Sequence, residues 1–263
     1  MGSYLTAKKQ IFAHQQPTDL AIVNRDNKIT KTVGAQVRGR RFWFSKKLFT
    51  DENGCFVSRG TVWFRLDGRQ TPLFKTIDIR LPGEHNLENV LAAACVASAL
   101  GVSPGRLKTV VKRFSGLDSR LQTIARCAGV TYVNDTAATT PHATIAAQRT
   151  VTNPIVLIAG GASKKIPAAE YRTLAKLIAR RCRAVVLFPG PGSESIIRAL
   201  RTVRFTRLVT GVPTMVLAVG IAKSLTKPGD AVLLSPASAS FGLFTNEFDR
   251  GAQFEAAVKT LCE

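Results

Sequence analysis

The sequence lacks the short motifs on which several large enzyme classes depend. It holds three histidines in 263 residues, and they form no recognisable catalytic triad or metal-binding set. A GxSxG serine-hydrolase elbow is absent, and so is the GxxxxGK(S/T) loop that cradles nucleotide phosphates. These absences argue against a serine hydrolase, and against a chain that cradles ATP phosphates by itself.

Long apolar runs and closely spaced cysteines are missing as well. No hydrophobic stretch approaches the length of a membrane span, and the N-terminus lacks a signal-peptide pattern. We therefore expect a cytoplasmic protein without a membrane partner. The cysteines show no CxxC pair and no metal-binding spacing, and we interpret all five as free thiols in a reducing cytoplasm: Cys55, Cys95, Cys127, Cys182 and Cys262.

Acidic residues are scarce relative to basic ones. The 17 Asp and Glu residues stand against 37 Lys and Arg residues, which gives a formal net charge of +20. A basic surface attracts phosphates, whether of nucleotides or of nucleic acids. The basic residues are dispersed rather than gathered in a tail, and the aromatic residues form no RNA-stacking motif. We therefore favour a solvated basic surface over dedicated nucleic-acid binding.

The first part of the chain reads as mixed helix and strand. A composition that is 45% hydrophobic is enough for one large domain or two ordinary domains with real cores. The pattern predicts a helix over residues 1–16, and then strands at 21–24, 41–45, 60–66 and 74–79. An Ala-rich helix then ends near Leu100, with Gly101 after it, and a further helix covers 103–114.

After Gly116 strands alternate with helices. Strands are predicted at 121–125, 130–133, 155–159, 184–188 and 231–235, and helices at 140–149, 168–181, 193–200, 212–224 and 244–261. This rhythm is typical of an α/β fold with a mostly parallel sheet and helices on both faces. We place a domain boundary near residues 115–118 and expect domains at 1–116 and 117–263.

The strand at 130–133 runs into an acidic, hydroxyl-rich turn. Asp135 stands where the strand stops, Thr139 and Thr140 can cap the next helix, and Pro141 suits its first turn. Ligands bind at the carboxyl ends of strands in open α/β sheets. The turn therefore suits a nucleotide or a carboxylate, although an ordinary capped turn explains it equally well.

Four other stretches carry polar groups that a fold does not require. Asn86 and Asn89 share a helix face and suit a nucleobase edge, or Asn86 simply caps the helix. Arg120, near the domain boundary, is a surface or hinge residue or a polyphosphate clamp. The GGASKK loop at 160–165 follows a buried strand and suits an anion, and the serines at 235–240 can hold a carboxylate.

Taken in order, these stretches resemble the Mur ligases, ATP-dependent amide-forming enzymes of peptidoglycan synthesis. The matching pieces are YLTAKKQIF at 4–12, GEHNLENVLAA at 83–93, FSGLDSR at 114–120, VNDTAATTP at 133–141, the GGASKK loop, and LLSPASASFGLFTNEFDRG at 233–251. They cover nearly the whole chain in the order of the family. Within it, the resemblance is strongest to the members that join D-glutamate to UDP-N-acetylmuramoyl-L-alanine.

The resemblance implies a fold and a set of site residues. It implies a C-terminal Rossmann-like domain, preceded by the end of an α/β central ligase domain. Lys8 matches the lysine whose carbamate helps to bind the metal ion, and Asp135 matches the carboxylate at the nucleotide. Asn86 and Asn89 match the amides near adenine, and Arg120 matches the arginine on the phosphates. The positions around D-glutamate are matched by Thr139, Lys164, Ser240 and Phe241.

The implied reaction uses ATP and Mg²⁺, and it activates a carboxylate as an acyl phosphate before the amine of an amino acid attacks. Its substrates are small molecules: ATP, D-glutamate and UDP-N-acetylmuramoyl-L-alanine. Two positions depart from the family pattern. Ala137 replaces a frequent lysine, and Glu247 replaces a frequent aromatic residue, with Phe248 one place later.

The family's uridine-binding domain, phosphate loop, and magnesium-binding glutamate and histidine have no counterpart in these 263 residues. We therefore expect a C-terminal fragment, or half of a split enzyme whose other half is a separate chain. Two rivals stand beside this interpretation. One is another amide ligase of the Mur and folylpolyglutamate synthase superfamily, and the other is a non-catalytic binding module derived from such a ligase.

Overall fold

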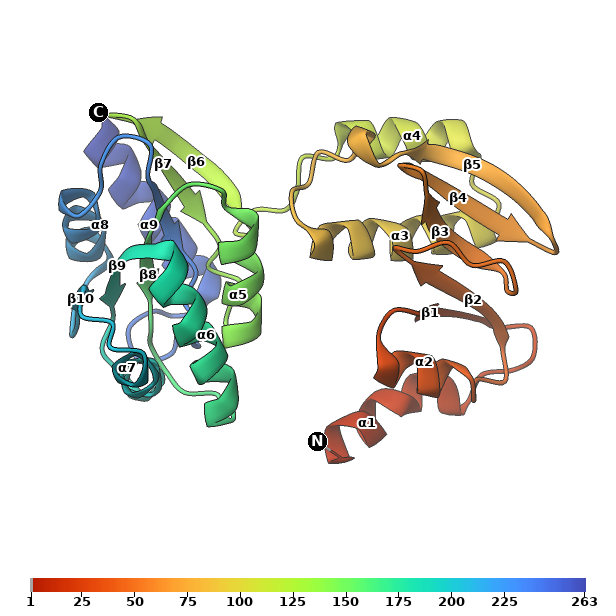
Figure 1. Ribbon diagram of the computed structural model, residues 1–263, viewed down its shortest axis with the longest axis horizontal. Helices are drawn as coiled ribbons and strands as arrows, with labels where there is room; N and C mark the ends of the chain where they lie inside the picture. The colour runs from red at the N-terminus through yellow and green to blue at the C-terminus, as the bar shows by residue number, and fades with distance from the viewer. Residues whose placement is uncertain (1) are drawn as a thin grey trace. The chain divides into compact units, whose positions relative to one another are not determined.

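The computed structural model describes the backbone of residues 2–263 and the side chains of residues 5–263. The chain divides into two compact units, the first ending at Ser115 and the second running from Gly116 to Glu263. Each unit has its own sheet (Figure 1). Each also has its own buried core.

Unit 1 is built on a five-stranded sheet in the order β1-β2-β3-β4-β5. The first three strands are parallel, and β3, β4 and β5 form an antiparallel meander. The strands are β1 (Leu20–Asn24), β2 (Arg40–Ser45), β3 (Gly54–Ser58), β4 (Thr61–Leu66) and β5 (Arg69–Lys75). The helices are α1 (Gly2–Ala13), α2 (Lys28–Gly34), α3 (Glu84–Ala99) and α4 (Pro104–Arg113), with a 3-10 turn, η1 (Thr76–Asp78).

Different parts of unit 1 pack against the two faces of this sheet. One face packs against the apolar sides of α3 and α4, where Leu91 and Leu107 meet Phe42 and Phe64. On the other face, a second hydrophobic cluster contains Val23, Trp43, Phe49 and Phe56, and Phe12 of α1 packs beside it. Because alternate strand residues point to opposite faces, Phe42 and Trp43 enter different clusters.

Unit 2 has a six-stranded sheet in the order β10-β9-β8-β11-β7-β6. All neighbours are parallel except β6 and β7, which form an antiparallel hairpin. The strands are β6 (Gln122–Cys127), β7 (Val130–Asn134), β8 (Ile155–Ala159), β9 (Cys182–Leu187), β10 (Leu208–Val209) and β11 (Ala231–Leu234). The helices are α5 (Pro141–Thr150), α6 (Ala168–Arg181), α7 (Pro191–Thr202), α8 (Met215–Ser224) and α9 (Glu247–Cys262).

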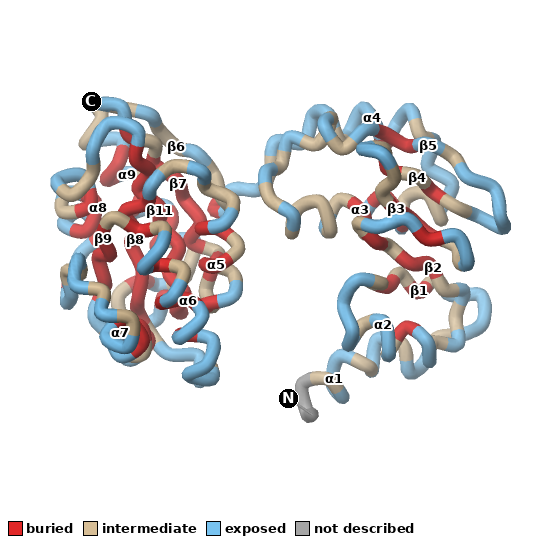
Figure 2. The backbone as a smooth tube through the Cα atoms, viewed as in Figure 1, coloured by how far each residue is buried: buried red, intermediate tan, exposed pale blue. Residues whose placement is uncertain are grey.

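Helices cover both faces of the second sheet. One core cluster joins the sheet to α5, α6 and α7, and the other joins it to α8 and α9. The central strands β8 and β11 are buried along their whole length (Figure 2). This explains why they read as continuous apolar runs rather than as alternating ones. The predicted α/β fold with a mostly parallel sheet and helices on both faces is confirmed for this unit.

Several predicted elements of unit 1 were wrong in extent. The first helix ends at Ala13 rather than at 16, and the strand placed at 74–79 is β5 followed by η1. The short elements α2 and β3 of unit 1 were not predicted, and neither was β10 of unit 2. β5 contains Pro72, which signals against a strand in the sequence; it is tolerated because β5 lies at the edge of the sheet.

The prediction of five free thiols was also wrong. Cys127 and Cys262 form a disulfide with their Cα atoms 5.8 Å apart, whereas Cys55, Cys95 and Cys182 are free and buried. The two bonded residues are 135 positions apart in the sequence, so no local spacing pattern could reveal the pair. Among residues 2–263, no helix has both the length and the apolar character needed to cross a membrane.

Candidate functional site

Three loops of unit 2 lie side by side at one edge of its sheet. They follow β7, β8 and β11, which are neighbouring parallel strands in the order β8-β11-β7. Because parallel strands present their carboxyl ends at the same edge, the loops at 135–140, 160–167 and 235–246 meet there. The predicted turn after β7, the GGASKK loop and the serine-rich stretch are thus parts of one region.

Backbone hydrogen bonds tie the loop after β11 to the loops on either side. Its Ala237 N–H donates to the Ala138 carbonyl over 2.9 Å. On the other side, Ala162 and Ala239 exchange hydrogen bonds of 3.0 and 3.1 Å. Gly161 permits this close approach, because a Cβ atom there would lie 2.5 Å from the Ala239 carbonyl oxygen, and its φ is +127°. The edge is therefore a connected framework rather than three independent loops.

Asp135 is the buried carboxylate of this edge, with 7% of its surface exposed. Its Oδ2 accepts from the Ser235 hydroxyl over 2.8 Å, and its Oδ1 accepts from the Leu121 N–H over 3.2 Å. Burial raises the pKa of Asp135 to about 7, while the bond from Ser235, the bond from Leu121 and the charge of Arg120 act in the opposite direction. A cationic ligand, or one that donates a hydrogen bond to the carboxylate, would favour its ionised form.

Arg120 is exposed on the segment that leads into β6. Its neighbours Ser119 and Leu121 both have left-handed backbone, with φ of +64° and +49°. Such conformations are costly for residues other than glycine and often occur at functional sites. They hold Arg120 between the buried Ser119 and the N–H group that binds Asp135. The guanidinium is thereby placed as a cation close enough to act on the Asp135 carboxyl.

Thr139 and Lys164 are brought together from different loops. Lys164 Nζ donates to Thr139 Oγ1 over 2.7 Å, across 25 positions of sequence. Of the two residues predicted as possible helix caps, Thr140 is the N-cap, since its hydroxyl accepts from the Ala143 N–H over 3.4 Å. Thr139 is left to face Lys164. An ammonium group beside a hydroxyl is a pair suited to holding a carboxylate.

Ser240 and Phe241 have opposite surroundings. Ser240 is 3% exposed, and its carbonyl accepts from the Phe244 N–H over 3.2 Å. Phe241 is 67% exposed, as is Phe248 at 70% on the first turn of α9. The structure therefore presents two aromatic rings to solvent near the start of α9, while Ser240 lies inside the loop.

Arg250 is a buried residue that the sequence analysis missed. It is fully buried on α9, and it donates to Thr136 Oγ1 and to the Thr136 carbonyl over 2.9 Å each, and to the Ser238 carbonyl over 3.2 Å. Burial lowers the pKa of Arg250 to about 10. The side chain thus joins the loops after β7 and β11 to α9. The signal in the sequence was an arginine within the apolar pattern of a helix.

The two predicted amides lie in unit 1, at the start of α3. Asn86 Nδ2 donates to the Pro82 carbonyl over 2.7 Å, and the helix N-cap is Gly83, so Asn86 stabilises the first turn without being its cap residue. Asn89 is exposed and lies on the wall of an apolar cavity of about 510 Å³ between α3 and α4. Arg106 is the other strongly polar residue of that wall.

Lys8 lies in the middle of α1 and is exposed. Among the residues that the structure describes, no group of three or more His, Cys, Asp or Glu side chains could hold a metal ion. The described donors thus do not form a magnesium site by themselves. Carbamylation of Lys8 stays a prediction.

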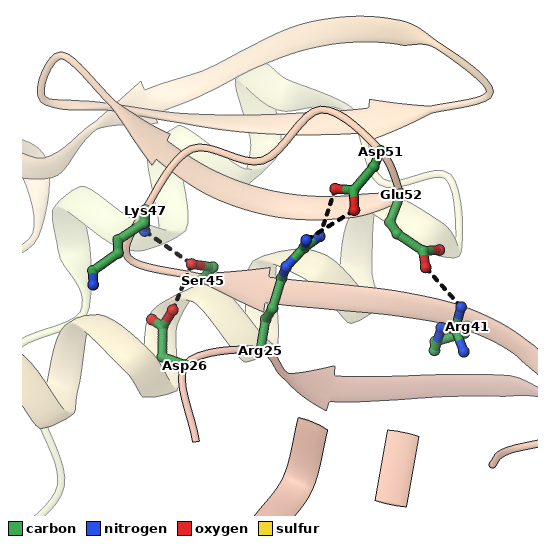
Figure 3. A network of polar contacts seen from close by, with 7 residues as sticks. All are labelled: Arg25, Asp26, Arg41, Ser45, Lys47, Asp51 and Glu52. Carbon is green, nitrogen blue, oxygen red and sulfur yellow. Dashed lines mark hydrogen bonds and ion pairs between the residues drawn. The ribbon is translucent and has the colours of Figure 1, made fainter. Parts of the chain in front are cut away.

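A polar network of unit 1 links Arg25, directly after β1, and Arg41, near the start of β2, to the loop between β2 and β3 (Figure 3). Arg25 forms a two-pronged bond with Asp51, at 2.7 and 2.9 Å, and Arg41 pairs with Glu52 at 2.7 Å. The Arg25 guanidinium holds the pKa of Asp51 at about 2. These pairs fasten the loop between β2 and β3 to the sheet, which is a structural role.

Comparison with known proteins places both units in one family. Residues 1–97 match the Mur ligase middle domain, and residues 119–238 match the Mur ligase glutamate ligase domain. Among solved structures, MurF from Acinetobacter baumannii aligns with a TM-score of 0.71 at 18% identity, covering 99% of this chain and 55% of that one. A pseudomurein peptide ligase type C from Methanothermus fervidus aligns with a TM-score of 0.68 at 13% identity, covering 99% and 60%.

Curated relatives are more similar in sequence. The UDP-N-acetylmuramoylalanine–D-glutamate ligase of Roseiflexus sp. (strain RS-1) is 40% identical over 269 residues, and that of Symbiobacterium thermophilum is 37% identical over 264 residues. Each match covers 99% of this chain and 57% of the relative, so the chain spans little more than half of their length. Two adjoining domain matches, the fold and these relatives agree, and the chain belongs to the Mur ligase family.

Proposed function

We propose that this chain forms part of an ATP-dependent ligase that adds D-glutamate to UDP-N-acetylmuramoyl-L-alanine. In this proposal residues 1–116 belong to the central ATPase domain, and residues 117–263 form the C-terminal domain that receives the amino acid. The relatives that bear this enzyme's name support the choice of substrates. The observation that carries the proposal is the meeting of Asp135, Thr139 and Lys164 at one sheet edge.

The residues of unit 2 fall into two groups by chemistry. Lys164 and Thr139 offer an ammonium and a hydroxyl 2.7 Å apart, and we assign them to a carboxylate of D-glutamate. Ser240 and Phe241, on the adjoining loop, shape the same end of the site. Arg120 and Asp135 lie at the entry to β6 and the end of β7, and we assign them to the nucleotide.

The reaction class sets what these groups must do. ATP phosphorylates the carboxylate of the acceptor, and the amino group of D-glutamate attacks the acyl phosphate. Holding the second carboxylate in place turns the attack into an effectively intramolecular step. Cationic side chains such as Arg120 offset the charge of transferring phosphates. Asn86 and Asn89 are assigned to the adenine edge, and Lys8, once carbamylated, to a magnesium ion.

A chimaeric enzyme tests the proposal. The part of the Roseiflexus ligase that precedes the matched region is joined to these 263 residues, and phosphate release is measured with ATP and UDP-N-acetylmuramoyl-L-alanine. We expect release that depends on D-glutamate. The 263-residue chain alone serves as the control and should release none, because no GxxxxGK(S/T) loop is present in it.

The same assay separates the rivals. A panel of other amino acids and of a folate acceptor replaces the substrates one at a time. Release with another amino acid, but not with D-glutamate, would assign the chain to a different ligase of the superfamily. A folded chimaera that binds ATP but turns over nothing would favour the non-catalytic binding module.

A further inference from the structure

The disulfide joins the ends of two elements of unit 2, the hairpin strand β6 and the C-terminal helix α9. Cys127 is the last residue of β6, just before the two-residue turn formed by Ala128 and Gly129. Cys262 is the last residue of α9 and the penultimate residue of the sequence. Their Cα atoms lie 5.8 Å apart, within the usual range for a disulfide. The bond thus closes almost the whole unit into one covalent loop.

The two bonded cysteines differ from the others in exposure. Cys127 and Cys262 are half-buried, one beside an exposed hairpin turn and one at a helix end. Cys55, Cys95 and Cys182 are buried in the cores of their units. Thiol–disulfide exchange requires a reagent to reach the sulfur, so it is selective for accessible cysteines. In the folded chain, therefore, exchange is restricted to this pair.

The helix fastened by the disulfide is also the helix that holds the site loops. Arg250 on α9 binds Thr136 and Ser238, and the Glu247 carbonyl accepts from the Thr136 hydroxyl over 3.0 Å. Further along α9, Glu255 Oε1 accepts from Asn134 Nδ2 over 2.8 Å. The same helix therefore carries the disulfide at its C-terminal end and, nearer its start, hydrogen bonds to the loops that follow β7 and β11.

We propose that Cys127 and Cys262 form a reversible thiol–disulfide site that controls the stability of unit 2. The oxidised pair fastens the end of α9 to the edge strand β6 and thereby holds the loops at 135–140 and 235–246 in their bonded arrangement. The reduced pair releases the last turn of α9 and loosens both loops. Its relevance to D-glutamate binding rests on the proposed function, whereas the thiol chemistry and the stability change do not.

The exchange balances with a low-molecular-weight disulfide of the glutathione type as the oxidant. The thiolate of one cysteine attacks that disulfide, forms a mixed disulfide and expels one small thiolate. The thiolate of the second cysteine then attacks the sulfur of the first cysteine in this mixed disulfide and expels the second small thiolate. The two protons lost by the cysteines pass to the two departing thiols, and the small disulfide is reduced by two electrons. Reduction by excess small thiol is the reverse.

Peptide mapping of the full chain tests the bond itself. The native protein is equilibrated with oxidised glutathione, and free thiols are trapped with N-ethylmaleimide without denaturant. We expect a cross-linked peptide pair containing Cys127 and Cys262, lighter than the two thiol peptides by two hydrogen atoms. Label on both of these cysteines in the oxidised sample would overturn the proposal.

Thermal unfolding tests the consequence. Disulfides that close long loops typically stabilise a protein enough to raise its Tm by roughly 5–15 °C for a unit of this size. We expect a rise of that order on oxidation of the wild type. The double variant Cys127→Ser with Cys262→Ser serves as the control and should unfold at the same temperature in both buffers. Equal Tm values for oxidised and reduced wild type would show that the disulfide does not control the stability of unit 2.

Hydrogen exchange then tests whether oxidation of the cysteine pair stabilises the loops at 135–140 and 235–246. The Ala137 and Ala239 amides, which bond to the Ser119 and Ala162 carbonyls, should exchange faster in the reduced protein. In the double serine variant their exchange should not respond to glutathione. Unchanged exchange in the wild type would refute the coupling between α9 and the loops. None of these measurements uses D-glutamate, so they are independent of the assignment of substrates.

Discussion

Arg250 Nε donates to the Thr136 hydroxyl over 2.9 Å, and this bond joins residues that are 114 positions apart. The same guanidinium reaches the Ser238 carbonyl, so one side chain of α9 contacts two of the three loops of the candidate site. Among the described residues, no carboxylate forms an ion pair with it to offset its charge. The three accepting oxygens take that role through charge-assisted hydrogen bonds.

Replacing this side chain should destabilise unit 2. Arg250→Ala leaves a cavity and three acceptors without their donor, and we expect a loss of about 2–4 kcal/mol in the free energy of unfolding. Urea unfolding followed by circular dichroism measures it. Arg250→Met restores most of the volume without the donors and separates the two causes. Arg201→Ala, at an exposed position of α7, should change stability by less than about 0.5 kcal/mol.

The strands and helices that position Arg250 were largely predictable from the sequence, whereas the contacts of its side chain were not. The hydrophobic pattern after Gly116 predicted most of the strands and helices along the chain, because periodicity reports burial directly. It also placed Asp135 at the end of a strand. Short elements such as α2 and β10 were not predicted, because α2 has only seven residues and β10 only two, too few to show a hydrophobic period.

Contacts between distant side chains could not be predicted in the same way. The bond between Lys164 and Thr139 depends on β8 and β7 lying two strands apart in the sheet, with β11 between them. The disulfide depends on α9 returning to the edge strand β6. Both follow from the tertiary arrangement of strands, which local propensity does not encode.

The buried Asp135 should make stability depend on pH. Its folded pKa of about 7 lies above the ordinary value of 3.8, so the folded protein retains the proton over a range where the unfolded chain has lost it. The free energy of unfolding should therefore fall as pH rises from about 4 to about 7, and this contribution should level off above that. The expected loss is roughly 2–4 kcal/mol.

Asp135→Asn isolates this contribution. An asparagine keeps an acceptor for the Leu121 N–H and does not titrate, so the variant should gain stability relative to the wild type as pH rises from about 4 to about 7. Urea unfolding of both proteins across this range gives the difference, in which the other titrating groups cancel. A difference that does not change with pH would show that Asp135 is ionised throughout.

Arg120 gives a prediction about the nucleotide. In the chimaeric enzyme, Arg120→Ala should mainly raise the KM for ATP, because the guanidinium is assigned to the phosphates. The KM for D-glutamate should change little. Arg126→Ala, at an exposed position of the adjoining strand β6, removes the same charge from the same unit and should leave both constants close to wild type. Equal effects of the two variants would assign Arg120 to the general basic surface.

Lys164 gives the matching prediction about the amino acid. Its ammonium lies 2.7 Å from the Thr139 hydroxyl, and both groups are assigned to a carboxylate of D-glutamate. Loss of one charge-assisted hydrogen bond costs about 1.5–3 kcal/mol, so Lys164→Ala should lower kcat/KM for D-glutamate by roughly 10- to 150-fold. The measurement varies D-glutamate at saturating ATP in the chimaeric enzyme. Lys176→Ala, at an exposed position of α6, is the matched control.

The form of the loss distinguishes binding from general damage. If Lys164 holds the carboxylate equally in the ground state and the transition state, the KM for D-glutamate rises while kcat is preserved. Thr139→Val should then produce a smaller change in the same direction, because a neutral hydroxyl contributes less than an ammonium group. If Lys164 is instead one of the many solvated lysines of a basic protein, Lys164→Ala will match Lys176→Ala in every constant. That result would remove Lys164 from the site and leave the amino acid to other residues of the same edge.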